Sequence, residues 1–270
     1  MADAAIATGS KPSRLAPRDA TRLITAAERS FYGEQGYLRV DRPMVDTAAI
    51  KEVRDILDGL FADADAPEGY VHELGAVGTY GSVPEIIWPS LLRPQLKRTK
   101  VFAMMRELAL ELLDVDRVRL HFDHAIFKPP LNAGPTAWHQ DVVFDPTHDC
   151  PVATIWFALV EATEENGCMM FIPGSHRGEI HEHVPYGKDG RQSVDVSTDK
   201  KVVCPLPAGG LTVHQQRTLH AAGPNHSSGT RAAWIVKLIP DDRNLARRTL
   251  SDLNQKARRL VHAKLPPPVG

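Results

Sequence analysis

The chain of 270 residues carries 32 Lys and Arg against 33 Asp and Glu, a formal net charge of −1, so no global field would recruit nucleic acid or an anionic membrane. The length suits one sizeable domain, and three cysteines at unremarkable spacings argue against a disulfide framework and favour a reducing compartment. No stretch approaches the ~18 apolar residues of a membrane span. Together with the charge balance and the cysteines, this predicts a cytoplasmic protein without a membrane partner.

The start of the chain predicts a short tail in front of one domain. Residues 1–18 lack the apolar run of a secretory signal and are expected to be flexible. Residues 19–270 are expected to form a single jelly-roll domain, with helices over 19–115 and a β core over 116–240. A basic stretch near the end, 247–259, is interleaved with apolar residues and is expected to be a solvated helix face.

The first part of this domain predicts mainly helices. One is expected over Asp19–Gln35, ending at Gly36, and a second opens at Asp46, a good N-cap residue. A third is expected over Leu96–Leu113, with its two methionines in the core. Residues 62–85, between the second and third, have the character of a long loop that covers a site.

From Arg117 the pattern changes to short extended runs separated by turns. Several short strands at such spacing are typical of a sandwich or barrel. We therefore expect a mainly β fold, a jelly roll with flanking helices. The runs are RVRLHFDHAIFK, TAWHQDVVF, VATIWFALVEA, CMMFIPG, KVVCPL, GGLTVHQ and RAAWIVKLI.

One of these runs places a histidine and a carboxylate two residues apart. In a strand, His139 and Asp141 leave on the same face and Gln140 on the other. A third ligand from a distant strand would complete the two-histidine, one-carboxylate triad that leaves positions open on Fe(II). Alone, the HxD pair is more often an ordinary turn or surface pair, so its context has to decide.

Three histidines of LTVHQQRTLHAAGPNHSSGTRAAW are candidates for that third ligand, namely His214, His220 and His226. Composition does not choose among them. The arrangement favours His220, which ends a strand-like segment before a Gly-Pro-Asn turn, while Arg231 opens the next strand. On hairpin neighbours the two would face the same interior, where the arginine offers a planar fork for the far carboxylate of a chelating acid.

These motifs together resemble a known family. WHQD, then W…ENGCMMFIPGSHRG, then LHAAGPNHSSGTR resemble the phytanoyl-CoA dioxygenase family of Fe(II)- and 2-oxoglutarate-dependent oxygenases. The match runs from about Phe127 to Lys237 and more loosely to FYGEQGYLRV at the front. The resemblance implies a double-stranded β-helix, the cupin-like jelly roll. It also implies iron held by His139, Asp141 and His220, with O2 and 2-oxoglutarate as cosubstrates.

The resemblance also implies a cosubstrate site. Arg231 would bind the distal carboxylate of 2-oxoglutarate, and Trp156 stands at the family's aromatic position beside it. Thr154 shares the face of Trp156, and His124 falls where relatives place another cosubstrate contact, often of a different residue type. Two residues after the distal histidine, Ala222 replaces a hydroxyl present in some relatives, so one polar contact is missing.

Other polar residues have simpler interpretations. His214 is expected to be structural, Lys128 to extend along a strand end towards solvent, and His176 to fasten a turn. Arg231 would otherwise be a surface ion pair, and His124 a satisfied core histidine. The remaining histidines of this half are expected to be exposed, namely His148, His181, His183 and His226.

The function expected from the resemblance is hydroxylation of an unactivated C–H bond in a small, secondary-metabolite-like substrate. Desaturation, cyclisation and epimerisation share the same start, whereas Asp141 occupies the position that halogenating relatives keep open for chloride. Loops 66–84, 142–151 and 181–196 would shape the pocket. Phe144, Tyr80 and Lys128 are expected to contact the substrate.

Several alternatives stay open at this point. They are a jelly-roll metal-binding module without turnover, a zinc hydrolase with the same ligands, and an acyl-CoA hydroxylase. An arginine placed to bind a carboxylate beside the metal argues against the module. The lack of an evident general base argues against the hydrolase. The absence of a dense basic cluster in the loops argues against a coenzyme A thioester as substrate. Monomer and homodimer are both compatible with the sequence.

Overall fold

The computed structural model describes residues 22–241, apart from 64–66, 68, 75–79, 132, 145–149 and 187–190. The expected tail, the basic stretch 247–259 and His148 lie outside the described residues, so the expectation of a single domain over 19–270 stays a prediction. Among the helices that are described, none is long and apolar enough to cross a bilayer.

The three predicted helices are present, but the first and third begin later than predicted. The described helices are α1 (Ala26–Gln35), α2 (Thr47–Phe61), α3 (Pro89–Leu92), α4 (Lys100–Leu113) and the 3-10 turns η1 (Pro94–Arg98), η2 (Asp141–Val143) and η3 (Ser175–Arg177). The N-cap at Asp46 is confirmed, because its side chain accepts from Ala49 N. The predicted starts at Asp19 and Leu96 were wrong. Thr25 and Glu28 form a capping box before α1, and Thr99 caps α4.

The strands form two facing sheets and a hairpin. They are β1 (Tyr37–Val40), β2 (Val71–Leu74), β3 (Val83–Ile87), β4 (Val118–Lys128), β5 (Thr136–His139), β6 (Ala153–Ala158), β7 (Met169–Phe171), β8 (Val184–Tyr186), β9 (Arg191–Ser193), β10 (Val202–Cys204), β11 (Leu211–His214), β12 (His220–Ala222) and β13 (Arg231–Pro240). The large sheet has the order β1-β11-β6-β13-β4-β3-β2 and the small sheet the order β10-β7-β12-β5, while β8 pairs with β9.

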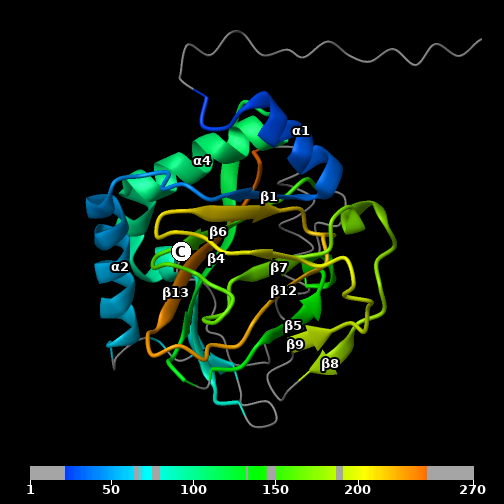
Figure 1. Cartoon of the computed structure of the whole chain (residues 1–270). Coiled ribbons are helices and arrows are strands. Elements are labelled where there is room, and N and C mark those ends of the chain that lie inside the picture. The colour runs from blue at the N-terminus through cyan, green and yellow to red at the C-terminus, as the bar shows by residue number, and fades with distance from the viewer. Residues whose placement is uncertain are drawn as a thin grey trace, which may run out of the picture.

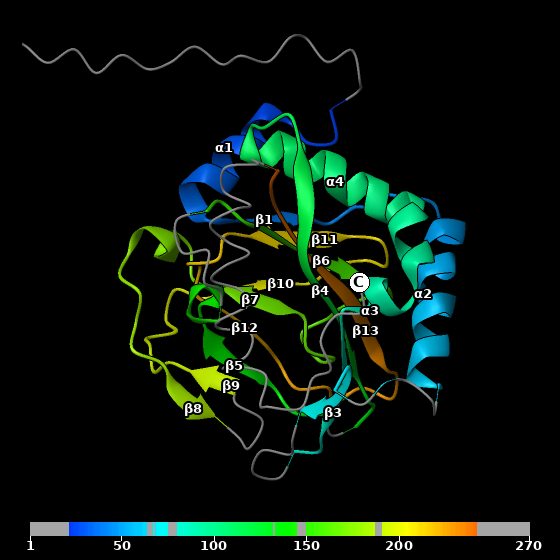
Figure 2. The ribbon, with the colours of Figure 1, turned by 180° about the vertical axis from the view of Figure 1, so that it is seen from behind.

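This is the predicted jelly roll with flanking helices. Helix α4 packs on β4, β6 and β13, and α2 packs on α4, so helices cover the outer face of the large sheet, while β5 and the β8–β9 hairpin lie at the opposite corner (Figure 1, and from behind Figure 2). Alternation along β13 sends Trp234 and Val236 into the core beneath the helices and Ala233 and Ile235 towards the small sheet. The second side is called the inner face below.

Two segments expected to be loops contain strands. The segment 62–85 holds β2 and most of β3, with Pro84 inside β3, and 181–196 holds the β8–β9 hairpin. Residues 62–85 have no clear alternation of apolar and polar residues, and the proline further weakened the strand signal. Because β3 pairs with β4, the segment supplies the large sheet with part of its inner face.

The predicted hairpin between His220 and Arg231 is wrong. His220 opens β12 in the small sheet, whereas Arg231 opens β13 in the large sheet, so the connection crosses from one sheet to the other. Asn225 holds this crossing, since its amide donates to the carbonyls of Lys128, Pro129 and Gly229. The two side chains still enter one interior, from facing sheets rather than from neighbouring strands.

Candidate metal and cosubstrate site

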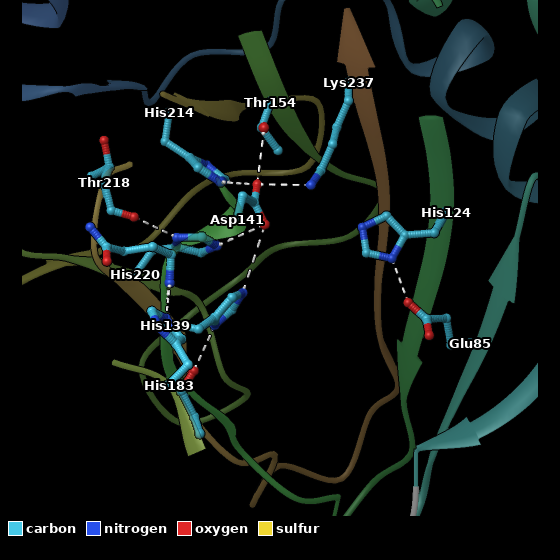
Figure 3. Close-up of polar contacts among 12 residues, drawn as sticks. Glu85, His124, His139, Asp141, Thr154, His183, His214, Thr218, His220 and Lys237 are labelled. Carbon is cyan, nitrogen blue, oxygen red and sulfur yellow. Dashed lines mark hydrogen bonds and ion pairs between the residues drawn. The ribbon is translucent and has the colours of Figure 1, made fainter. Parts of the chain in front are cut away.

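Three side chains predicted as metal ligands meet between the sheets. His139 ends β5 and pairs in register with His220 at the start of β12, while Asp141 opens η2. One ligand atom from each lies within 4.8 Å of the others. The Nε2 atoms of His139 and His220 lie 3.9 and 3.8 Å from Oδ1 of Asp141 (Figure 3). The sequence predicted that His139 and Asp141 share one side of a strand. In the structure the extended backbone ends at Gln140 and a 3-10 turn begins at Asp141, so strand alternation does not place Asp141.

Hydrogen bonds fix both imidazoles with one nitrogen free. Nδ1 of His139 donates to the carbonyl of Ala137 and Nδ1 of His220 to the carbonyl of Thr218, each over 2.8 Å. Each Nε2 therefore directs its lone pair towards Oδ1 of Asp141. Burial, followed by the neighbouring histidines, lowers the pKa of both rings to about 3, so they are neutral as ligation requires.

The two oxygens of Asp141 have separate surroundings. Oδ2 accepts from Thr154 Oγ1 at 3.1 Å, from His214 Nε2 at 3.3 Å and from Lys237 Nζ at 3.1 Å, while Oδ1 faces the two imidazoles. Burial would raise the pKa of this carboxyl, but Lys237 and the histidines outweigh it and hold the pKa well below its usual range. Asp141 is thus an anion with one oxygen left for a cation.

His214 and Gln140 support this arrangement from two sides. His214, the alternative to His220, contacts Oδ2 of Asp141 and lies outside the three converging ligand atoms. Gln140 points the other way, and its amide donates to the carbonyls of Glu179 and Arg217. Its backbone N–H donates to Nε2 of His183 at 2.9 Å, so the expectation of an exposed His183 was wrong.

Arg231, the first residue of β13, is buried and has nitrogen atoms without a hydrogen-bond partner. Its side chain is 1% exposed, and Nε and Nη1 have no hydrogen-bond partner. The guanidinium lies 5.1 Å from the ring centre of Trp156, and burial lowers its pKa to about 9. A buried guanidinium with free donors is costly without an anion, so this end of the interior is suited to a carboxylate.

Lys128 is the neighbour of Arg231 in the register of β4 and β13. The expectation that it extends towards solvent was wrong, because it is fully buried and its ammonium donates to the carbonyl of Gly223. Burial, with the charge of Arg231 next, lowers its pKa well below the usual value. Two basic side chains thus lie side by side at this end.

The other predicted contacts are distributed around these groups. His124, on the inner face of β4, hydrogen-bonds through Nδ1 to Glu85 Oε1 at 2.5 Å and points towards the metal site (Figure 3). The ring of Phe144 lies 6.0 Å from that of His139. Tyr80 instead contacts His226, with ring centres 6.0 Å apart. Ala222 is buried on β12 and offers no hydroxyl.

Sequence reasoning missed two charged residues near the metal site, Lys237 and Glu85. Lys237 had a usable signal, since it is the one charged residue between Arg231 and the end of the apolar run RAAWIVKLI. Glu85 had none, because its segment was interpreted as a loop.

Comparison with known proteins gives a family match over most of the chain. A family model described as phytanoyl-CoA dioxygenase (PhyH) matches residues 32–233. A probable alpha-ketoglutarate-dependent hypophosphite dioxygenase from Stutzerimonas stutzeri is 38% identical over 129 residues, 45% of this chain and 45% of that protein. The match thus spans about half the length of this curated relative.

Two crystal structures extend the similarity to most of the fold. EvdO2 from Micromonospora carbonacea var. aurantiaca, complexed with 2-oxoglutarate, is 28% identical with a TM-score of 0.68, covering 80% of this chain and 91% of EvdO2. The epimerase SnoN from nogalamycin biosynthesis, in complex with Fe3+, alpha-ketoglutarate and nogalamycin RO, is 25% identical with a TM-score of 0.66, covering 79% of this chain and 82% of SnoN.

Proposed function

The chain belongs to the phytanoyl-CoA dioxygenase (PhyH) family, and from this premise we propose that it is an Fe(II)- and 2-oxoglutarate-dependent dioxygenase acting on a small molecule. The observation that carries the proposal is the pairing, in one interior, of a two-histidine, one-carboxylate cluster with a buried arginine whose donors are free. The first suits a divalent metal and the second suits the far carboxylate of a chelating acid.

The protein groups fit ferrous iron by their chemistry. His139 and His220 present Nε2 and Asp141 presents Oδ1, while backbone carbonyls and the partners of Oδ2 hold the three side chains in place. Bound iron and 2-oxoglutarate would together supply the oxidising power to activate dioxygen and attack a C–H bond. The protein orients the ligands, screens them from bulk water and leaves positions free for cosubstrate and dioxygen.

Arg231 would fix the orientation of 2-oxoglutarate by holding its distal carboxylate. Trp156 packs beside the guanidinium and forms an apolar wall for the carbon chain. Thr154 bonds to Asp141, so we assign it to ligand positioning rather than to direct cosubstrate contact. His124, paired with Glu85, we assign to the substrate side of the metal.

The substrate class follows from the relatives in broad terms. SnoN is an epimerase from nogalamycin biosynthesis, which supports a secondary-metabolite-like substrate here. Hydroxylation, desaturation, cyclisation and epimerisation all fit the site. Asp141 fills the metal position that a halide would need. A reducing, cytoplasmic setting fits the three buried, free cysteines.

A metal-binding module without turnover fits the structure less well. Such a module has no need for a buried guanidinium with unsatisfied donors, and burying one costs several kcal/mol or shifts its pKa. A zinc hydrolase would need a general base beside the metal. The nearest described carboxylate, Glu85, is hydrogen-bonded to His124.

The test is an anaerobic titration of the protein with Fe(II) and then 2-oxoglutarate. A weak visible charge-transfer band should develop in the wild-type protein and be lost in Asp141→Ala. Under air, 2-oxoglutarate should be consumed with release of succinate. Tight zinc binding, with no spectral response of the Fe(II) protein to 2-oxoglutarate, would reject the proposed function.

A further inference from the structure

Lys237 places a cation on the inner face of β13, next to the metal ligands. It lies opposite Thr154 of β6 and Phe122 of β4 in the register of the large sheet. Its Nζ lies 3.1 Å from Oδ2 of Asp141, and its side chain keeps 11% of its surface exposed. That exposure distinguishes it from Lys128, which is fully buried. Part of the Lys237 side chain is therefore open to solvent.

This cation is far from the predicted cosubstrate anchor. Arg231 and Lys237 are six residues apart on one strand, which separates their backbones by roughly 20 Å. The metal ligands lie beside the Lys237 end of this strand, because Asp141 contacts Lys237 and Thr154. A cosubstrate anchored at Arg231 would extend along β13 towards the metal ligands, whereas Lys237 contacts the metal ligand Asp141 directly.

Charged groups of both signs line the inner face around Lys237. Among the described residues, the basic side chains include Lys128, Arg231 and Lys237, and the carboxylates include Asp141 and Glu85. Asp123 is on the outer face of β4, where Ser90 and Trp234 bond it. Lys237 contacts Asp141 through one oxygen, and an ammonium has three N–H donors, so it retains donors for a further anion.

A second polar group faces the same space. His124 is diagonal to Lys237 across the β4–β13 pair, because Ile235 lies opposite His124 and Lys237 opposite Phe122. Glu85 fixes the ring through Nδ1, which leaves Nε2 directed into the interior (Figure 3). The His124 and Glu85 side chains are 18% and 13% exposed, so they border accessible space, as Lys237 does.

We propose that Lys237 and His124 form a subsite for an oxyanion group of the substrate, a carboxylate or a phosphorus oxyanion, beside the metal. Lys237 supplies the charge, and His124 donates from Nε2 to the oxyanion when both ring nitrogens carry a proton, while Glu85 accepts from Nδ1 and holds the ring. The inference deepens the proposed function and rests on it. It narrows the expected small-molecule substrate to one whose acidic group positions a nearby C–H or P–H bond for oxidation.

The test compares acids with neutral analogues on the protein loaded anaerobically with Fe(II) and 2-oxoglutarate. The probes are acetate against acetamide and methylphosphonate against its dimethyl ester, with affinities read from the change in the charge-transfer band. One acid class should bind about tenfold or more tightly than its neutral analogue. The two pairs distinguish a carboxylate from a phosphorus oxyanion.

Substitutions then test whether Lys237 causes the tighter binding of acids. Lys237→Gln keeps a donor for Asp141 without the charge and should remove the preference, whereas Lys237→Arg should retain it. The exposed Lys201→Met serves as a control for the change in net charge and should bind like wild type. Should Lys237→Gln fail to bind Fe(II), the same comparison in His124→Phe decides, and a smaller preference for the acid is expected.

Two results would overturn the inference while leaving the proposed function in place. One is a normal charge-transfer band with equal affinity for acids and neutral analogues. The other is a preference for acids that survives in Lys237→Gln, or in His124→Phe where that variant decides, because the metal alone would then account for it. Absence of the band from the wild-type protein would instead reject the proposed function, and the inference with it.

Discussion

The two oxygens of the Asp141 carboxylate have different partners in the candidate site. Three donors converge on Oδ2, from Thr154, His214 and Lys237, and none of them contacts Oδ1. A carboxylate held in this way presents one oxygen in a fixed direction. We infer that these donors favour monodentate ligation, which keeps more metal positions free than bidentate ligation would.

Thr154→Val should therefore weaken Fe(II) binding. The substitution keeps the shape of the side chain but removes one donor from Oδ2, and losing such a supporting contact typically costs about 10–100-fold in metal affinity. Competition with a chromophoric chelator under anaerobic conditions measures it. The matched control is Thr212→Val, because Thr212 is also fully buried but its hydroxyl has no partner. Equal affinities in the two variants would contradict the role given to Thr154.

Arg231→Ala should lose affinity for 2-oxoglutarate without losing the fold. Charged hydrogen bonds contribute about 1.5–3 kcal/mol, so the dissociation constant should rise roughly 10–150-fold. Removing a buried cation with unsatisfied donors should leave the metal-free protein at least as stable. Arg231→Lys keeps the charge but not the planar fork and should recover only part of the affinity. Unchanged titration of the charge-transfer band with 2-oxoglutarate in Arg231→Ala would refute this assignment.

At the scale of elements, the predicted runs contain β4, β5, β6, β7, β10, β11 and all but the last residue of β13, whereas β2, β3, β8 and β9 lie in segments that were expected to be loops. The pattern from Arg117 to Lys128 predicted β4 almost to the residue. In contrast, β8 and β9 have three residues each, too few to show a period. The wrong hairpin between β12 and β13 has another cause, because a Gly-Pro-Asn turn fits a short hairpin and a crossing between sheets equally well.

The candidate site was predictable to a similar extent. Spacing and motif indicated His139, Asp141, His220 and Arg231, because each occurs within a recognisable run. The role of Lys237 depends on its register with Thr154, which is set by pairing between strands about 80 residues apart in the chain. Register of that kind is fixed by the packed sheet and leaves no local signal.

The crossing between β12 and β13 connects His220, a proposed metal ligand, with Arg231, the proposed cosubstrate anchor, and Gly167 and Asn225 hold it. Gly167 has a φ of 88°, and a Cβ there would meet the carbonyl oxygen of Gly223 at 2.3 Å, so the chain passes too close for a side chain. Asn225 is fully buried and donates to three carbonyls. The segments that precede and follow the crossing carry His220 and Arg231.

Asn225→Ala should thus reduce both stability and cosubstrate affinity. Losing these hydrogen bonds should cost about 2–4 kcal/mol of unfolding free energy, and the freed segment should misplace Arg231. Thr25→Ala is the control, since it removes the cap of α1 at a cost of about 1 kcal/mol, far along the chain from the crossing. Thermal unfolding and 2-oxoglutarate titration should separate the two variants, with affinity reduced only in Asn225→Ala. Loss of stability alone in Asn225→Ala would argue against coupling through the crossing.

For the whole molecule, the jelly roll creates an interior that the free protein leaves electrostatically unbalanced. Lys128 and Arg231 lie side by side with no described carboxylate between them, and burial lowers the pKa of both. Native proteins tolerate such an arrangement where a ligand compensates it. We infer that some folding stability is given up in the free protein and regained when an anion binds.

Lys128→Met should accordingly raise the stability of the metal-free protein and flatten its dependence on pH. In the unfolded chain the lysine has a pKa of about 10.4, whereas burial keeps the native pKa well below this. Between the two values the unfolded state binds the extra proton, so the free energy of unfolding of the wild type should rise with pH, by at most about 1.4 kcal/mol per unit from this group. Urea unfolding at pH 7 and pH 9 measures it, with the exposed Lys201→Met keeping the wild-type slope. Parallel pH dependences for wild type and Lys128→Met would show that the native pKa of Lys128 is not lowered, and would contradict the cost assigned here to its burial.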